Sequence, residues 1–108
     1  MGIISNIWGF FVRIWNAVKR LFVRLLQFFQ HIASWFNDPS RLRRLEQDKR
    51  LMAVAIKERL ENGNYGIVKC LYNKQTEGVE EMADGIASEQ VDAETQRHFG
   101  NKEMIVQE

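Results

Sequence analysis

Residue types that carry out catalysis or bind metals are few and scattered along this chain. The two histidines, His31 and His98, are far apart in the sequence, and the single cysteine, Cys70, has no histidine at a metal-ligand spacing. A lone cysteine among apolar residues is most simply a small buried side chain. One cysteine cannot form an intrachain disulfide, which excludes the disulfide-rich secreted class. The sequence therefore predicts neither a metal site nor a catalytic nucleophile.

Two other motifs resemble chemical sites but lack the residues that such sites need. The glycines of the segment 62–66 (Asn-Gly-Asn-Tyr-Gly) have neither the lysine nor the spacing of a phosphate-binding loop. Glu80 and Glu81 are most simply part of a solvated acidic face. We therefore expect a non-enzymatic protein that uses no cofactor.

Charge is divided unevenly along the 108 residues, although the formal net charge is only +1. Residues 1–37 contain four basic side chains and no Asp or Glu, residues 38–61 have a net charge of +2, and residues 62–108 have a net charge of −5. The first segment also contains all three tryptophans. A basic, apolar front and an acidic rear suggest a membrane or polyanion partner for the front.

Residues 1–37 carry their apolar side chains with a helical period. Positions repeat about every eleven residues, as Ile3, Ile14 and Leu25 show, and the apolar face covers about half of a helical wheel. We predict one continuous amphipathic helix about 54 Å long, at 1.5 Å per residue. The face expected to contact a membrane or other copies comprises Ile4, Ile7, Trp8, Phe11, Ile14, Trp15, Val18, Phe22, Leu25, Leu26, Phe29 and Phe36.

A wide apolar face beside basic residues is typical of a helix that lies in a bilayer interface. The eleven-residue pattern is similar to that of lipid-surface proteins such as apolipoproteins and synucleins, over the first third of the chain only. We therefore expect a peripheral membrane protein that prefers anionic lipid. The expected contacts with anionic lipid are Arg13, Lys19, Arg20, Arg24, Arg41, Arg43 and Arg44.

Other uses of the same apolar face remain open. Packed copies of the helix could form a structural or pore-forming homo-oligomer, the helix could fit a groove on a larger partner, or it could pack on its own chain. A lone spanning helix is not expected, because the longest charge-free runs fall short of the ~20 residues that a span needs. A signal peptide is not expected either, because no uninterrupted apolar core precedes a cleavage site.

The first residues also raise two targeting hypotheses. Gly2 after Met1 suggests myristoylation, but Asn6 occupies the position that requires Ser or Thr. The acid-free basic stretch resembles a mitochondrial transit peptide in character, although it is poor in serine. We expect membrane association with a reducing aqueous side, most simply the cytoplasmic face.

A break at residues 37–40 separates the first segment from a second. Pro39 suits the first turn of a new helix and Asp38 its N-cap, so we predict a second, charged helix over residues 38–63, closed by Asn62 and Gly63. The basic cluster that follows the break could contact lipid phosphates or form a solvated face. Nucleic acid is the least favoured partner, because no stacking aromatic residues lie among these charges.

Residues 64–108 are expected to form a small acidic α+β module of β-β-α-β order. Residues 65–72 read as a strand and residues 73–78 as a turn, while residues 79–87 are ambiguous. Residues 88–99 read as a helix and residues 104–106 as a last strand. The sequence thus predicts a mainly α chain with a small α+β module that recruits a protein partner or caps an assembly. So small a module needs docking of the second helix or oligomerisation.

Overall fold

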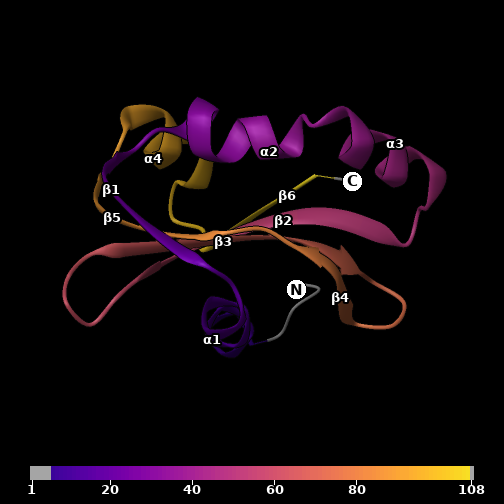
Figure 1. Cartoon of the computed structure of the whole chain (residues 1–108), viewed down its shortest axis with the longest axis horizontal. Helices are drawn as coiled ribbons and strands as arrows, with labels where there is room; N and C mark the ends of the chain where they lie inside the picture. Colours follow the sequence, from indigo (N-terminus) through magenta and orange to yellow (C-terminus); the bar gives the residue numbers. More distant parts are fainter. Residues whose placement is uncertain (1–5, 108) are drawn as a thin grey trace.

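The computed structural model describes residues 6–107, which form an α+β fold built on a six-stranded mixed sheet (Figure 1). No long N-terminal helix is present in this part of the chain. The elements are α1 (Ile7–Ala17), β1 (Arg20–Leu26), η1 (Phe29–Ala33), α2 (Ser34–Phe36), α3 (Pro39–Gln47), β2 (Leu51–Arg59), β3 (Tyr65–Asn73), β4 (Gly78–Met82), β5 (Gly85–Val91), α4 (Ala93–Phe99) and β6 (Met104–Gln107).

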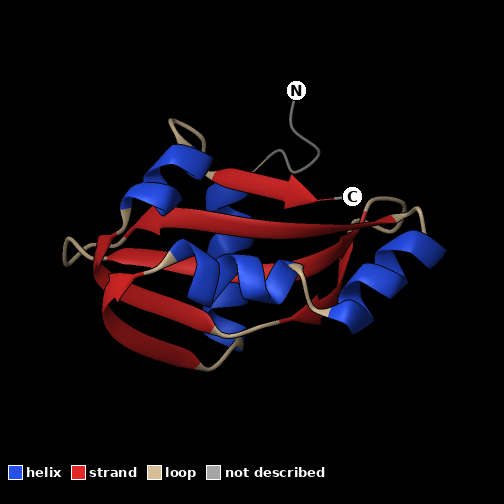
Figure 2. Cartoon of the chain, turned by 90° about the horizontal axis from the view of Figure 1, so that it is seen from above, coloured by secondary structure: helices blue, strands red, loops and turns tan. Residues whose placement is uncertain are grey.

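The strands follow the order β1-β5-β3-β2-β6, with β4 beside β3. β2 and β3 pair antiparallel over nine residues each, from Leu51 opposite Asn73 to Arg59 opposite Tyr65. β1 pairs with β5 in parallel, and β6 pairs with β2 antiparallel. β1 and β6 therefore lie at opposite edges of the sheet, as the view from above shows (Figure 2).

Helices cover the two faces of the sheet unequally (Figure 1). α1 crosses one face, here called the α1 face, where Phe10, Phe11 and Ile14 pack on Met52 and Val54. The opposite face, here called the α2 face, is covered by η1, α2, α3 and α4. Its core comprises Leu26, Phe28, Ile32, Trp35, Phe36, Leu45, Leu51, Ala53, Ala55, Ile67, Leu71, Ile86, Val91 and Phe99.

The prediction of one helix over residues 1–37 is wrong, because residues 20–26 form an edge strand. Arg20 and Arg24 are four residues apart, a spacing that aligns side chains along a helix but, being even, also places them on one face of a strand. α1 begins at Asn6, whose side-chain oxygen accepts a hydrogen bond from the Gly9 amide at 3.0 Å. It ends at Val18, where the backbone becomes extended. Pairing with β5 then satisfies one side of the β1 main chain.

The second predicted helix is correct at its start and wrong in its second half. Pro39 occupies the first turn of α3, and the Asp38 carboxylate accepts a hydrogen bond from the Arg41 amide at 3.2 Å. The helix ends at Gln47, and the residues that follow form β2, a buried strand between β3 and β6. Pairing on both sides overrides the helical propensity of this segment. Gly63, at φ +89°, lies in the turn between β2 and β3 rather than in a helix cap.

The C-terminal prediction is partly correct. The strand at residue 65, the helix that ends at Phe99 and the last strand are present as β3, α4 and β6. The helix begins only at Ala93, because Asp92 caps it, and β5 includes residues 88–91. The ambiguous stretch forms β4 and the start of β5. The mainly α class is therefore wrong, since strands from residues 20–26, 51–59 and 65–107 join one sheet.

Candidate functional site

β1 is an open edge of the sheet that carries large apolar side chains. One side of the strand pairs with β5, and no other described strand pairs with its outer side. The exposed fraction is 43% for Leu21, 57% for Phe22, 41% for Leu25 and 63% for Phe29. Edge strands of natural proteins are usually protected against pairing with other chains. We call the set Lys19, Arg20, Leu21, Phe22, Arg24, Leu25 and Phe29 the β1 edge surface.

Apolar side chains extend from both faces of this edge. Leu21 lies beside Ile86, which belongs to the core of the α2 face. Phe22 lies beside Ala87 and therefore on the α1 face, where a side chain at the nearby Gly85 would meet Trp15. β1 thus exposes apolar side chains on both faces, as a strand does when the neighbouring strand that would cover it is missing.

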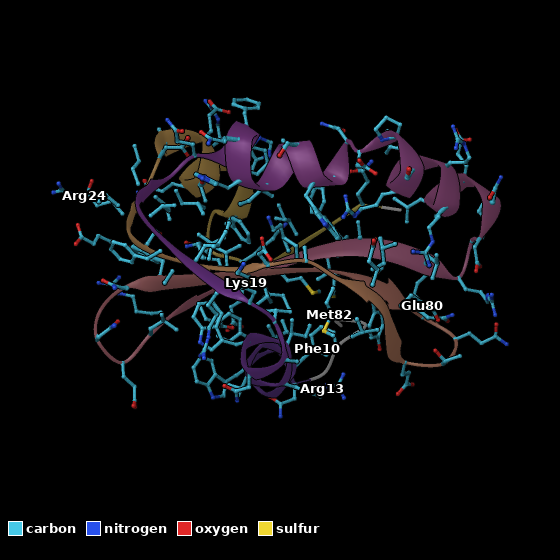
Figure 3. The ribbon with its side chains drawn as sticks, in the orientation of Figure 1. Phe10, Arg13, Lys19, Arg24, Glu80 and Met82 are labelled. Carbon is cyan, nitrogen blue, oxygen red and sulfur yellow. The ribbon has the colours of Figure 1, made fainter. Side chains whose placement is uncertain are left out.

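Basic residues lie next to these apolar residues in the sequence of β1 and just before it, and two of them, Lys19 and Arg24, are labelled in Figure 3. The Arg24 Nε atom lies 3.7 Å from the Glu89 carboxylate, and both side chains are largely exposed. The guanidinium carbon of Arg20 lies 5.7 Å from the centre of the Trp15 ring. An exposed ion pair contributes about 0–1 kcal/mol, so Arg24 is readily available to another acidic partner.

A second apolar feature lies beside the start of β1, between α1 and β4. This groove of about 270 Å³ is lined by Arg13, Ile14, Val79 and Met82, among others. Figure 3 shows Phe10, Arg13 and Met82 in this part of the molecule. The Arg13 guanidinium carbon lies 5.2 Å from the centre of the Phe10 ring. Arg13 therefore belongs to the rim of the groove rather than to the β1 edge surface.

The apolar residues selected from the sequence are divided between the core and the surface. Phe22, Leu25 and Phe29 come together on the β1 edge surface, whereas Trp8 is exposed on α1 and stacks on Phe11. Ile4 lies outside the described residues. The remaining members are buried or half-buried: Ile7, Phe11, Ile14, Trp15, Val18, Leu26 and Phe36.

The basic residues selected from the sequence are also divided. Lys19, Arg20 and Arg24 lie on the β1 edge surface. Arg41 and Arg44 instead contact Glu81 of β4, at 3.0 and 3.8 Å. Arg41 also lies over the Trp35 ring, with 4.2 Å between the guanidinium carbon and the ring centre. Arg43 is exposed on α3.

The opposite edge of the sheet has a hollow that sequence analysis missed. A cavity of about 510 Å³ lies beside β6 and is lined by Phe28, Phe36, His98 and Ile105, among others. Val106 on the same strand has an exposed fraction of 49%. The strand signal of residues 104–106 was visible in the sequence. The cavity was not, because it forms between segments that are about 70 residues apart.

An acidic pair marks the end of the sheet at which β6 begins. Glu58 Oε2 is shielded from solvent and has no hydrogen-bond partner among the described residues. Burial, and then the neighbouring Glu103 carboxyl, raise the pKa of Glu58 to about 7, against a smaller opposing effect of Lys57. The Glu58 and Glu103 carboxyls therefore lie close together at this end of the sheet.

The side chains most capable of catalysis or metal binding are buried or packed against other residues. Cys70 is buried, and burial raises the pKa of its thiol to about 12. The Lys69 ammonium group donates a hydrogen bond to the His31 carbonyl at 2.6 Å, and burial lowers its pKa to about 8. The His98 ring stacks on Phe28. Residues 6–107 contain no group of three or more His, Cys, Asp or Glu that could hold a metal ion.

Comparisons of the chain with protein-family models, curated proteins and solved structures give no match. In the described part of the chain, no helix has both the length and the apolar character needed to cross a bilayer.

Proposed function

We propose that this protein works by self-association, and that the β1 edge surface of one copy adds to a strand of another copy. One observation carries this proposal: β1 combines an unpaired main-chain edge with exposed Leu21, Phe22 and Leu25. A partner strand would satisfy the main chain and cover these side chains together. Association through a sheet edge takes the place of packing between long N-terminal helices.

The free energies favour a reversible assembly. Full burial of a large apolar side chain contributes about 1.5–3 kcal/mol, and the four on this surface are already half-covered, so together they contribute on the order of 3–6 kcal/mol. Each main-chain hydrogen bond adds about 0.5–1.5 kcal/mol. Association costs about 4–15 kcal/mol in lost translational and rotational freedom. We therefore expect the assembly to depend on protein concentration.

Sedimentation velocity over a range of concentrations tests this proposal, with Phe22→Glu as the variant. Gln75→Glu is the matched control, because it adds the same charge to an exposed loop between β3 and β4. We expect the wild type and Gln75→Glu to form oligomers as concentration rises, while Phe22→Glu stays monomeric because strand addition would bury its carboxylate. A monomeric wild type, or oligomers of Phe22→Glu equal to those of the wild type, would refute the proposal.

Binding to an anionic lipid surface is a second candidate, favoured by the position of Phe22 and Phe29 beside three basic residues. Basic side chains near an anionic membrane contribute about 1 kcal/mol each. The open main-chain edge of β1 argues against deep insertion, because its amide and carbonyl groups would have no partners in hydrocarbon. Contact would therefore be at headgroup depth, with the acidic C-terminal residues on the aqueous side.

Flotation with phosphatidylcholine vesicles, with and without phosphatidylserine, tests this second candidate. If it holds, the wild type floats only with phosphatidylserine present, and the triple variant Lys19→Gln, Arg20→Gln, Arg24→Gln does not float. A wild type that oligomerises in buffer and stays at the bottom of both gradients would contradict lipid binding while supporting self-association.

A further inference from the structure

We infer that the receiving half of the interface is the β6 edge of a second copy, so that the chains assemble head to tail. This inference rests on the proposed self-association through β1 and adds the identity of the partner strand. Three independent features of the β6 edge carry it: the direction of the strand, the shape and apolar character of its surroundings, and its charge.

The strand directions suit this pairing. β1 runs parallel to β5, β5 and β2 both run antiparallel to β3, and β6 runs antiparallel to β2. The two edge strands of one molecule therefore run in opposite directions. A second copy shifted along the sheet brings its β6 against β1 as an antiparallel pair, which continues the sheet without a break in its pattern (Figure 2).

The side chains at the two edges match by face. On the α1 face, Phe22 would meet Val106, which pairs with the core residue Val54 and is itself half-exposed. On the α2 face, Leu21 and Leu25 would meet Ile105 and the cavity of about 510 Å³ beside it. Both apolar rows of β1 thus gain a counterpart in a single arrangement.

The charges match at one end of the paired strands. Arg24 lies near the end of β1, at the end of the sheet where β2 finishes and β6 begins (Figure 3). Glu58 and Glu103 lie at that same end. In a shifted second copy these carboxyls would face the Arg24 guanidinium, which in the free chain lies near the exposed Glu89 carboxylate. The Arg24 guanidinium would then add a second cation to this carboxyl pair, on which Lys57 of the same chain has only a small effect.

A symmetric pairing of β1 with β1 fits less well. It would bring Arg20 and Arg24 of one copy close to the same residues of the other, and like charges on adjacent strands destabilise a sheet. It would also leave the β6 cavity and the Glu58–Glu103 pair without partners. Head-to-tail contacts have the further property that they do not close after two copies, so they generate rings or linear chains.

Mixing two edge variants tests the head-to-tail arrangement. Phe22→Glu blocks β1 and leaves β6 intact, whereas Val106→Glu blocks β6 and leaves β1 intact; both positions are about half-exposed, so the fold should persist. We expect each variant alone to raise the concentration for half-assembly by about tenfold or more, the equivalent of about 1.4 kcal/mol. An equimolar mixture should form heterodimers that grow no further in sedimentation velocity, whereas the wild type grows beyond dimers.

The outcomes separate this inference from the proposal on which it rests. If the wild type is monomeric, both fail. If Phe22→Glu abolishes assembly but Val106→Glu assembles like the wild type, self-association through β1 stands and the role of β6 is refuted. A mixture that stays monomeric also refutes the head-to-tail arrangement.

Circular dichroism checks the fold of each variant. Should a Glu variant unfold, Phe22→Ser and Val106→Thr are expected to show the same heterodimer on mixing, and its absence would overturn the inference.

Discussion

The apolar side chains of α1 and those of β1 have different surroundings, although only Val18 and Lys19 separate the two elements. α1 buries Phe10, Phe11 and Ile14 against the sheet. β1 leaves Phe22 and its neighbours more than two-fifths exposed. One apolar pattern thus supplies part of the core and then an uncovered edge, so a residue's hydrophobicity alone does not separate folding from binding in this chain.

Replacing one aromatic residue from each element should give the greatest difference in the free energy of unfolding. Phe11→Ala should lower the free energy of unfolding by about 3–5 kcal/mol, because Phe11 is 1% exposed and its loss leaves a cavity. Phe22→Ala should change it by about 0.5 kcal/mol or less in the monomer. Urea denaturation at low protein concentration measures both values. Equal losses for the two variants would show that Phe22 belongs to the core.

A smaller effect is expected where β1 ends and the next helix begins. The Asp92 carboxylate accepts hydrogen bonds from the Thr95 amide at 2.8 Å and from the Phe28 amide at 3.1 Å, so it caps α4 and holds the residue that follows β1. Asp92→Ala should lower the free energy of unfolding by about 1–2 kcal/mol. Urea denaturation of Asp92→Asn, measured alongside Asp92→Ala, shows how much of the lost free energy of unfolding a neutral capping side chain restores. An Asp92→Ala variant as stable as the wild type would mean that this junction does not hold β1.

The Glu58 carboxyl beside the opposite edge is expected to make the stability of the chain depend on pH. The pKa of Glu58 is raised to about 7 in the folded chain from an ordinary 4.5, so the folded state holds its proton longer than the unfolded state does. Ionisation of Glu58 therefore lowers the free energy of unfolding progressively as the pH rises from about 4.5 to about 7. Glu58→Gln should match the wild type below this range and exceed its stability above it. Denaturation of the monomer at several pH values measures this, and a pH-independent difference would contradict the carboxyl pairing.

The sequence predicted those helices and strands whose ends are marked by capping or turn residues. Asp38 and Pro39 begin a helix, and Tyr65 begins a strand, because caps and turns act within a few residues. Residues 20–26 could not be placed from the sequence, since Arg20 and Arg24 suit a helix and a strand equally and only pairing with β5, about 65 residues later, decides. The turn at Asn62 and Gly63 was the missed signal, because an Asn-Gly step between apolar runs favours a hairpin. The predicted apolar face included Phe22, Leu25 and Phe29 but not Leu21, and the separation of its residues into core and edge needed the fold.

Disulfide cross-linking between two introduced cysteines tests whether β1 of one copy pairs with β6 of another. Copies with Arg24→Cys are mixed with copies with Glu103→Cys under mild oxidation, and Gln75→Cys replaces Arg24→Cys in the control. Cys70 does not interfere, because it is buried. Head-to-tail pairing of β1 with β6 predicts a disulfide-linked heterodimer by mass spectrometry that forms faster than in the control. A heterodimer that forms no faster than the control would contradict the pairing of these two edges.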